Sequence, residues 1–124
     1  MKRNWNIVRE IMLEVEDQPA GMETFVDKMN VVQHYDRADV QHHANLLIEA
    51  GLLKGKAMPT IGGGLVVILQ GLTWEGHDWL ASIHSKTIFE KTLDFAKTKG
   101  VDLTLDMLKA LAVKLTAAHL GLSP

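Results

Sequence analysis

The sequence has 124 residues, of which 47% are hydrophobic, and its formal net charge is −2. This length suits one compact domain with a helical appendage, and the charge excludes a global positive field that would attract nucleic acid or anionic lipid. The chain contains no cysteine, which excludes disulfides and thiolate zinc sites and fits a reducing cytoplasm. With no signal peptide and no apolar run of membrane-spanning length, the sequence predicts a soluble, cytoplasmic protein that does not contact a membrane.

The N-terminal segment predicts an amphipathic helix that begins after Asn4, a residue type that caps helices. One broad face of this helix is apolar and comprises Ile7, Val8, Ile11, Met12 and Val15. Pro19 and Gly21 end the helix. The following residues fit either a short helix over Met22 to Met29 or a brief strand at Val31 and Val32, and the local pattern does not decide between them.

The rest of the chain is organised around the stretch from Tyr35 to Gly55. Asp36 is an N-cap, and Gly51 follows the last apolar turn of the predicted helix. The apolar positions at helical spacing are Val40, Ala44, Leu47 and Ile48. This helix runs directly into a strand, which is typical of the recognition helix and wing of winged-helix domains.

The predicted wing is a β-hairpin with strands over Leu52 to Met58 and Leu65 to Gln70, joined by the glycine-rich segment PTIGGG. A phosphate-cradling loop is the alternative for three consecutive glycines. Such a loop needs a Gly-Lys-Ser/Thr or GxGxxG motif that opens a helix, whereas a strand follows here.

Three further helices are predicted after the hairpin. Thr73 caps the segment TWEGHDWLASI, a second helix covers Ser85 to Lys99 and ends at Gly100, and Thr104 caps the last. The last helix carries a narrow apolar seam with alternating steps of three and four: Leu108, Leu111, Leu115, Ala118 and Leu122. This seam can dock on the preceding helix or pair with a second copy in a homodimer.

Histidines are the only tempting catalytic residues, at positions His34, His42, His43, His77, His84 and His119. No pair has the spacing of a helical zinc site, and no nucleophile elbow or close carboxylate pair occurs. We therefore expect no metal, no cofactor and no enzymatic activity. His43 lies between apolar neighbours of the predicted helix, so we expect a half-buried side chain that bonds to backbone.

The polar face of the central helix has the residue types that read bases. Gln41 and Asn45 can contact adenine, His42 lies on the same face, and Arg37 can reach guanine or phosphate. The predicted backbone contacts are Lys54 and Lys56 on the wing and Lys2 and Arg3 at the N-terminus. Asp39 and Glu49 would repel the phosphates, so a solvated polar face without DNA contacts is the alternative.

With these motifs, the sequence resembles domain-of-unknown-function family 2513, a group of short bacterial and prophage proteins. The matching pieces, in order along almost the whole chain, are MKRNWNIVREIMLEVE, VQHHANLLIEAGLL, the GGG before a strand, LTWEGHDWLASI and LDMLKALAVKLTAAHLG. The resemblance implies a winged-helix-like fold and a bacterial or prophage origin, and it supplies no activity and no catalytic residues.

Together, these patterns predict a mainly α fold with a small β-hairpin (α+β). A winged helix-turn-helix covers residues 1–84, and residues 85–124 form a helical pair that packs on the core or forms a dimer interface. The predicted function is binding of double-stranded DNA in transcriptional regulation. The alternative is a non-enzymatic winged-helix module that binds a protein partner, which would expose an apolar patch instead of gathering cations on one face.

Overall fold

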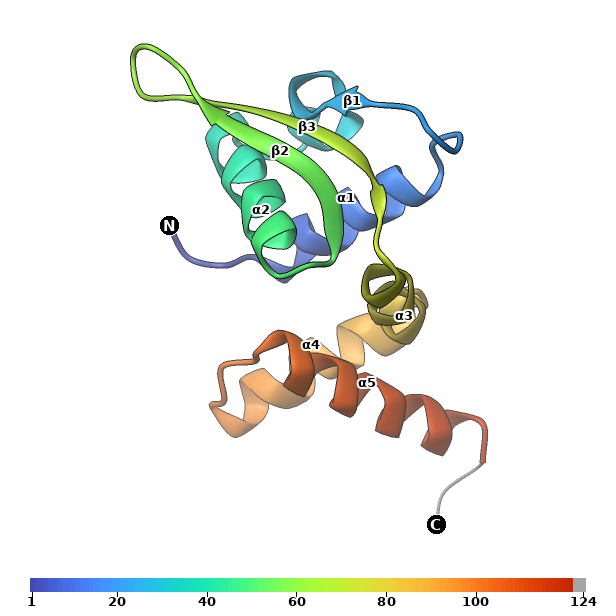
Figure 1. Cartoon of the computed structure of the whole chain (residues 1–124). Coiled ribbons are helices and arrows are strands. Elements are labelled where there is room, and N and C mark those ends of the chain that lie inside the picture. The colour runs from blue at the N-terminus through green and yellow to red at the C-terminus, as the bar shows by residue number, and fades with distance from the viewer. Residues whose placement is uncertain (122–124) are drawn as a thin grey trace. The chain divides into compact units, whose positions relative to one another are not determined.

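The computed structural model describes residues 1–121. Its elements in chain order are α1 (Trp5–Glu16), β1 (Thr24–Phe25), the 3₁₀ turns η1 (Val26–Lys28) and η2 (Asn30–Gln33), α2 (Arg37–Glu49), β2 (Leu53–Pro59), β3 (Leu65–Leu72), α3 (Trp74–Ile83), α4 (Lys86–Lys99) and α5 (Leu105–His119). Within these residues, five α-helices and a three-stranded antiparallel sheet make a mixed α+β fold (Figure 1). The prediction of a helical protein with a small β-hairpin is confirmed at this level.

The chain divides into two compact units, of which the first ends at His77 and the second begins at Asp78. The first unit contains the sheet, α1 and α2, and the second contains α4 and α5. Helix α3 spans the boundary. The predicted boundary, between residues 84 and 85, lies just after the end of α3.

Helix α1 begins and packs as its sequence predicts. The side-chain oxygen of Asn4 accepts the backbone N–H groups of Asn6 at 2.9 Å and Ile7 at 3.4 Å, which caps the helix. All five residues of the predicted apolar face are buried: Ile7, Val8, Ile11, Met12 and Val15. Within the first unit this helix packs against α2, β3 and η2.

The segment between α1 and α2 is neither of the two predicted alternatives. It forms the short strand β1, which pairs with β3, and then the turns η1 and η2. The carboxylate of Glu14 on α1 accepts the backbone N–H groups of Asn30 at 2.7 Å and Val31 at 3.1 Å, the first two residues of η2. Contacts with residues far away in the sequence, on α1 and β3, therefore determine this segment.

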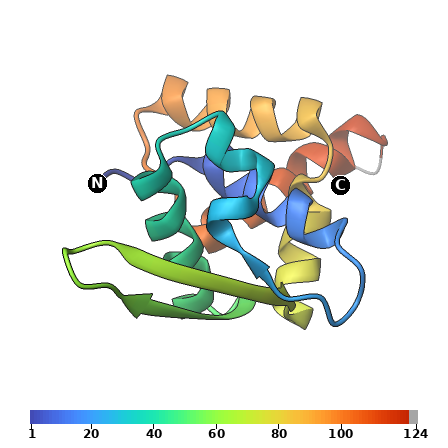
Figure 2. The same ribbon diagram turned by 90° about the horizontal axis from the view of Figure 1, so that it is seen from above.

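The sheet has the strand order β1-β3-β2, and β2 and β3 form the predicted hairpin. The register pairs Leu53 with Leu72 at the base of the hairpin and Met58 with Val66 near its tip, and a bulge follows Lys54. In both views the tip of the hairpin extends beyond α2 (Figure 1, Figure 2).

The end of α2 is fastened to the beginning of α3. Gly51 adopts a φ of 77°, which ends α2 in the left-handed region that favours glycine. The hydroxyl of Thr73 donates to the carbonyl oxygen of Gly51 at 2.5 Å, and its backbone N–H donates to the carbonyl oxygen of Leu52 at 3.0 Å. The same hydroxyl accepts the backbone N–H of Gly76 at 2.9 Å. A Cβ atom at Gly76 would collide with the carbonyl oxygen of Leu52, so only glycine fits there. These contacts join the segment EAGLL at the end of α2 to the segment LTWEG at the beginning of α3.

In the second unit, α4 and α5 pack against each other. The side-chain oxygen of Thr104 caps α5 and Gly100 ends α4 with a φ of 66°, both as predicted, and the side-chain oxygen of Ser85, predicted as the first residue of its helix, instead caps α4. The indole N–H of Trp79 on α3 donates to the carbonyl oxygen of Leu105 at 3.2 Å. The core residues that α4 and α5 contribute are Ile88, Phe89, Thr92, Ala96, Leu108 and Ala112.

The apolar seam of α5 is partly used inside the chain. Leu108 is completely buried, Leu111 and Leu115 are half-buried, and Ala118 is exposed, whereas Leu122 lies outside the described residues. Docking on α4 accounts for the burial of Leu108 and the partial burial of the next two leucines, and pairing with a second copy stays a prediction. Up to residue 121, no helix has the length and apolar character needed to cross a membrane.

Candidate functional site

Helix α2 turns one narrow stripe of side chains to solvent. The stripe consists of Ala38, His42, Asn45, Leu46 and Glu49, which share one side of the helix and are exposed or half-buried. Two of the predicted base-reading residues, His42 and Asn45, lie on it, and Arg37 is exposed in the first turn of the same helix. The stripe carries one formal charge, which is the negative charge of Glu49.

Gln41, the third predicted base-reading residue, points into the protein. Its side chain is 8% exposed, and its amide nitrogen donates to the carboxylate of Asp27 at 2.7 Å. A glutamine held in this way must break a charge-assisted hydrogen bond before it can contact a base. The placement of Gln41 supports a structural role, in which it ties α2 to η1.

His43 links α2 to the N-terminal segment. Its side chain is 1% exposed, its Nε2 accepts the backbone N–H of Asn4 at 2.7 Å, and its Nδ1 lies 2.6 Å from the carbonyl oxygen of Asp39. These partners require a proton on Nδ1 and none on Nε2. The expected bonding of His43 to backbone is confirmed, with deeper burial than predicted.

The same hydrogen bond places the predicted phosphate contacts Lys2 and Arg3 near α2, because they directly precede Asn4. The guanidinium of Arg3 lies over the ring of Trp5, 4.7 Å from its centroid. Such a cation–π contact orients the guanidinium group over the indole ring.

The two wing lysines lie on the other side of the sheet from α2. Along β2 the side chains alternate, and Gly55 faces Ile48 of α2 while Lys54 and Lys56 face outward. The structure therefore places His42 and Asn45 on one face and Lys54 and Lys56 on the opposite face. The first unit also contains seven lysines and arginines against ten aspartates and glutamates. Both observations weaken the electrostatic basis for a DNA interface.

The outward face of the sheet carries an apolar patch that the sequence analysis missed. Phe25 on β1 is directly opposite Ile68 on β3, and Met58 on β2 is directly opposite Val66. Phe25 is 50% and Met58 46% exposed, and Val66 and Ile68 are half-buried. We call Phe25, Met58, Val66 and Ile68 the outer sheet patch.

One feature of the sequence, a strand with apolar residues on both faces, indicates the outer sheet patch. In β3, outward Val66 and Ile68 alternate with inward Val67 and Leu69, so both faces of the strand are apolar. A strand with two apolar faces needs cover on both of them. Helices α1 and α2 cover one face, and Figure 1 shows the hairpin in front of these helices, with its outward face toward the viewer.

The other surface features of the first unit that we describe are two isolated exposed apolar side chains. Ile61 at the hairpin tip is fully exposed, and Trp74 at the start of α3 is 79% exposed. In the part of the chain that the structure describes, no three histidine, aspartate or glutamate side chains gather as a metal site would require.

Comparison with known proteins identifies the family. Residues 2–102 match the family described as "Hypothetical protein (DUF2513)". A protein from Haemophilus influenzae, described as an uncharacterized protein, is 31% identical over 112 residues, which cover 90% of this chain and 92% of that protein. No solved structure matches the chain. The chain therefore belongs to the DUF2513 family, as its sequence motifs predicted.

Proposed function

We propose that the first unit is a winged-helix module that binds another protein through its outer sheet patch. The winged-helix interpretation is supported by the order of elements, in which a helix, a short strand, two helical turns, a second helix and a hairpin follow one another. The strand order β1-β3-β2 supports it further, because the first strand then extends the sheet of the hairpin. In this interpretation α2 is the recognition helix and the β2–β3 hairpin is the wing.

The observation that carries the proposal is the exposure of large apolar side chains on the sheet. Contiguous exposed apolar residues with a polar rim are typical of protein interaction sites, and buried aromatic anchors supply much of the binding energy in such sites. Phe25 would be the anchor here, with Met58 as an adaptable neighbour. Lys54 and Lys56 stand at the rim, and neither has an ion-pair partner among residues 1–121. A partner with an apolar centre and an acidic rim therefore fits this surface best.

The test compares the two faces of the first unit by quantitative affinity purification from the cells that naturally make the protein. The variants Phe25→Glu and Met58→Glu place a charge in the outer sheet patch, and Ala38→Glu places the same charge on the exposed stripe of α2. We expect one partner to co-purify with the wild type and with Ala38→Glu, and to be lost from both patch variants, whose folding is checked by thermal unfolding. A partner that is retained by both patch variants would contradict the proposal.

A second candidate function, sequence-specific binding of double-stranded DNA in transcriptional regulation, is favoured by the exposed stripe of α2. His42 and Asn45 are accessible there, and the hydrogen bond between Asn4 and His43 brings Lys2 and Arg3 to the same helix. Binding would be measured by fluorescence anisotropy with duplexes from the upstream region of the gene and with a random duplex, at low and near-physiological salt.

This candidate predicts that the protein binds one duplex tightly and that this binding persists at the higher salt concentration. The variant Asn45→Ala should weaken the binding by roughly 1–3 kcal/mol, the range for a lost base contact. Gln41→Ala serves as a control that removes a buried amide of the same helix. Equal, weak binding to all duplexes that disappears with salt would exclude a sequence-specific regulator.

A further inference from the structure

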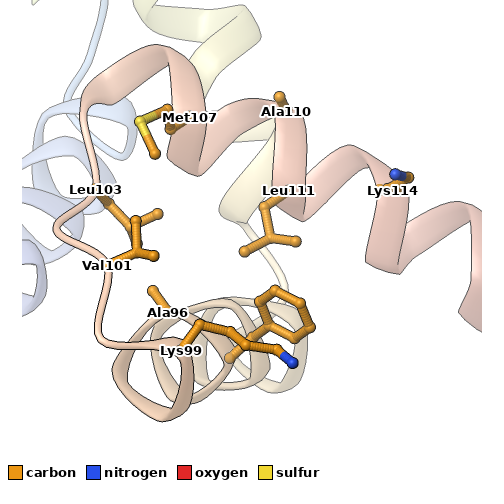
Figure 3. A pocket seen from close by; sticks show the side chains of 9 residues that line it. Ala96, Lys99, Val101, Leu103, Met107, Ala110, Leu111 and Lys114 are labelled. Atoms are coloured by element: carbon orange, nitrogen blue, oxygen red, sulfur yellow. The ribbon is translucent and has the colours of Figure 1, made fainter.

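The second unit contains an open groove between α4 and α5, with a volume of about 360 Å³ (Figure 3). Its apolar wall is made by Phe95 from α4, Val101 and Leu103 from the connecting segment, and Met107 and Leu111 from α5. Phe95, Val101 and Met107 are between 43% and 46% exposed. A volume of this size is within the range of small-molecule sites, which are commonly apolar with a few polar groups.

The charges at the groove have one sign. Of the residues that the structure describes, Lys99 from α4 and Lys114 from α5 line it, and no acidic residue does. The ammonium group of Lys99 lies 5.7 Å from the ring centroid of Phe95. Figure 3 shows the nitrogen atoms of the two lysines on opposite walls of the groove, that of Lys99 beside α4 and that of Lys114 beside α5, with Val101, Leu103 and Met107 toward the other end of the groove.

We infer that this groove binds a medium-chain monocarboxylate of the fatty-acid type. The alkyl chain would lie along Met107, Leu103 and Val101, where it is removed from water. The carboxylate would lie between Lys99 and Lys114, which supply opposite charge to it from two helices. The charge complementarity selects an anionic amphiphile over a neutral or cationic one, and the inference is independent of the function proposed for the first unit.

The experiment uses the full chain with ¹³C-labelled methionine methyl groups, of which the sequence has six. Met107 lies in the groove, Met58 reports on the outer sheet patch and Met12 on the core of the first unit. Decanoate, decanol and decyltrimethylammonium are titrated separately below their micellar concentrations. We expect decanoate to shift the Met107 signal in a saturable manner and to leave the signals of Met58 and Met12 unchanged. Decanol should bind more weakly, and decyltrimethylammonium weakest of the three.

Charge-reversal variants test the role of the lysines. Replacement of both cations, in Lys99→Glu together with Lys114→Glu, should weaken decanoate binding about tenfold, because two partly exposed ion pairs are lost, and should leave decanol binding unchanged. Lys97→Glu is the matched control for Lys99→Glu, because Lys97 is two residues away on the same helix, exposed, and on the opposite side from Phe95. It should bind decanoate as the wild type does.

Any of the following results would overturn the inference. The first is an unchanged Met107 signal with decanoate, or equal binding of decanoate and decyltrimethylammonium. The second is binding to vesicles of anionic phospholipid without binding to free decanoate. The third is a Met107 signal that shifts with protein concentration alone, together with a doubled mass in sedimentation, because a second copy would then occupy the groove.

Discussion

Substitution of Gly76 by alanine tests how the first unit is fastened at the junction of α2, β2 and α3. The added Cβ atom would meet the carbonyl oxygen of Leu52, which is backbone and cannot rotate away. That oxygen accepts the N–H of Thr73, whose hydroxyl in turn accepts the N–H of Gly76. The collision therefore strains two hydrogen bonds at once.

The magnitude follows from three contributions. Each weakened hydrogen bond costs about 1 kcal/mol, and overpacking costs about 1–3 kcal/mol. Alanine has a better helix propensity than glycine by about 1 kcal/mol, which offsets part of the loss. We expect Gly76→Ala to lower the free energy of unfolding by about 2–4 kcal/mol.

The assay is equilibrium unfolding in urea, followed by tryptophan fluorescence, because Trp5 and Trp74 both lie in the first unit. Glu75→Ala is the control, since Glu75 is exposed in the same helical turn and its loss should change stability by less than about 0.5 kcal/mol. If Gly76→Ala is as stable as this control, the close approach of α3 to Leu52 does not determine the junction.

Three further predictions concern the contacts of α1. His43→Ala should lower the free energy of unfolding by about 3 kcal/mol, because it opens a buried cavity and leaves the N–H of Asn4 without its acceptor; a loss below 1 kcal/mol in urea unfolding would contradict this role. Glu14→Ala should lower the free energy of unfolding by about 1–2 kcal/mol and speed hydrogen exchange in η2, because the Glu14 carboxylate accepts the first two N–H groups of that turn. Unchanged exchange in η2 would refute this role of Glu14. Burial raises the pKa of Tyr35, and the carboxylate of Glu10 raises it further. The neutral phenol therefore stabilises the fold at a pH below about 10, the ordinary pKa of tyrosine, and this stabilisation is lost as the pH rises through the pKa of the folded state. An ultraviolet titration of the single tyrosine should show this raised pKa and its partial return in Glu10→Gln, whereas an equal pKa in both proteins would exclude the contribution of Glu10.

The helices were predictable because their signals are local. Asn4, Asp36 and Thr104 cap the helices that follow them, as residue type and position indicate, and Gly51 and Gly100 end helices with positive φ. The helical spacing of the apolar residues in α1 likewise predicted which face of this helix is buried.

The segment before α2 and the candidate site were less predictable, because they depend on partners far away in the sequence. The strand β1 exists because β3 pairs with it, and η2 is held by a carboxylate sixteen residues earlier. Gln41 has the residue type of a base contact, but Asp27 occupies its amide. The outer sheet patch assembles from three strands, so neither Phe25 nor Met58 indicates it alone.

The measurement that tests the central claim most directly is site-specific photo-crosslinking in the cells that naturally make the protein. A benzophenone side chain is introduced at Phe25 or Met58 in the outer sheet patch and, for comparison, at His42 on α2. The account predicts that both patch positions crosslink to the same protein and that position 42 does not. Crosslinks to nucleic acid from position 42, with none from positions 25 and 58, would contradict it and identify α2 as the functional face.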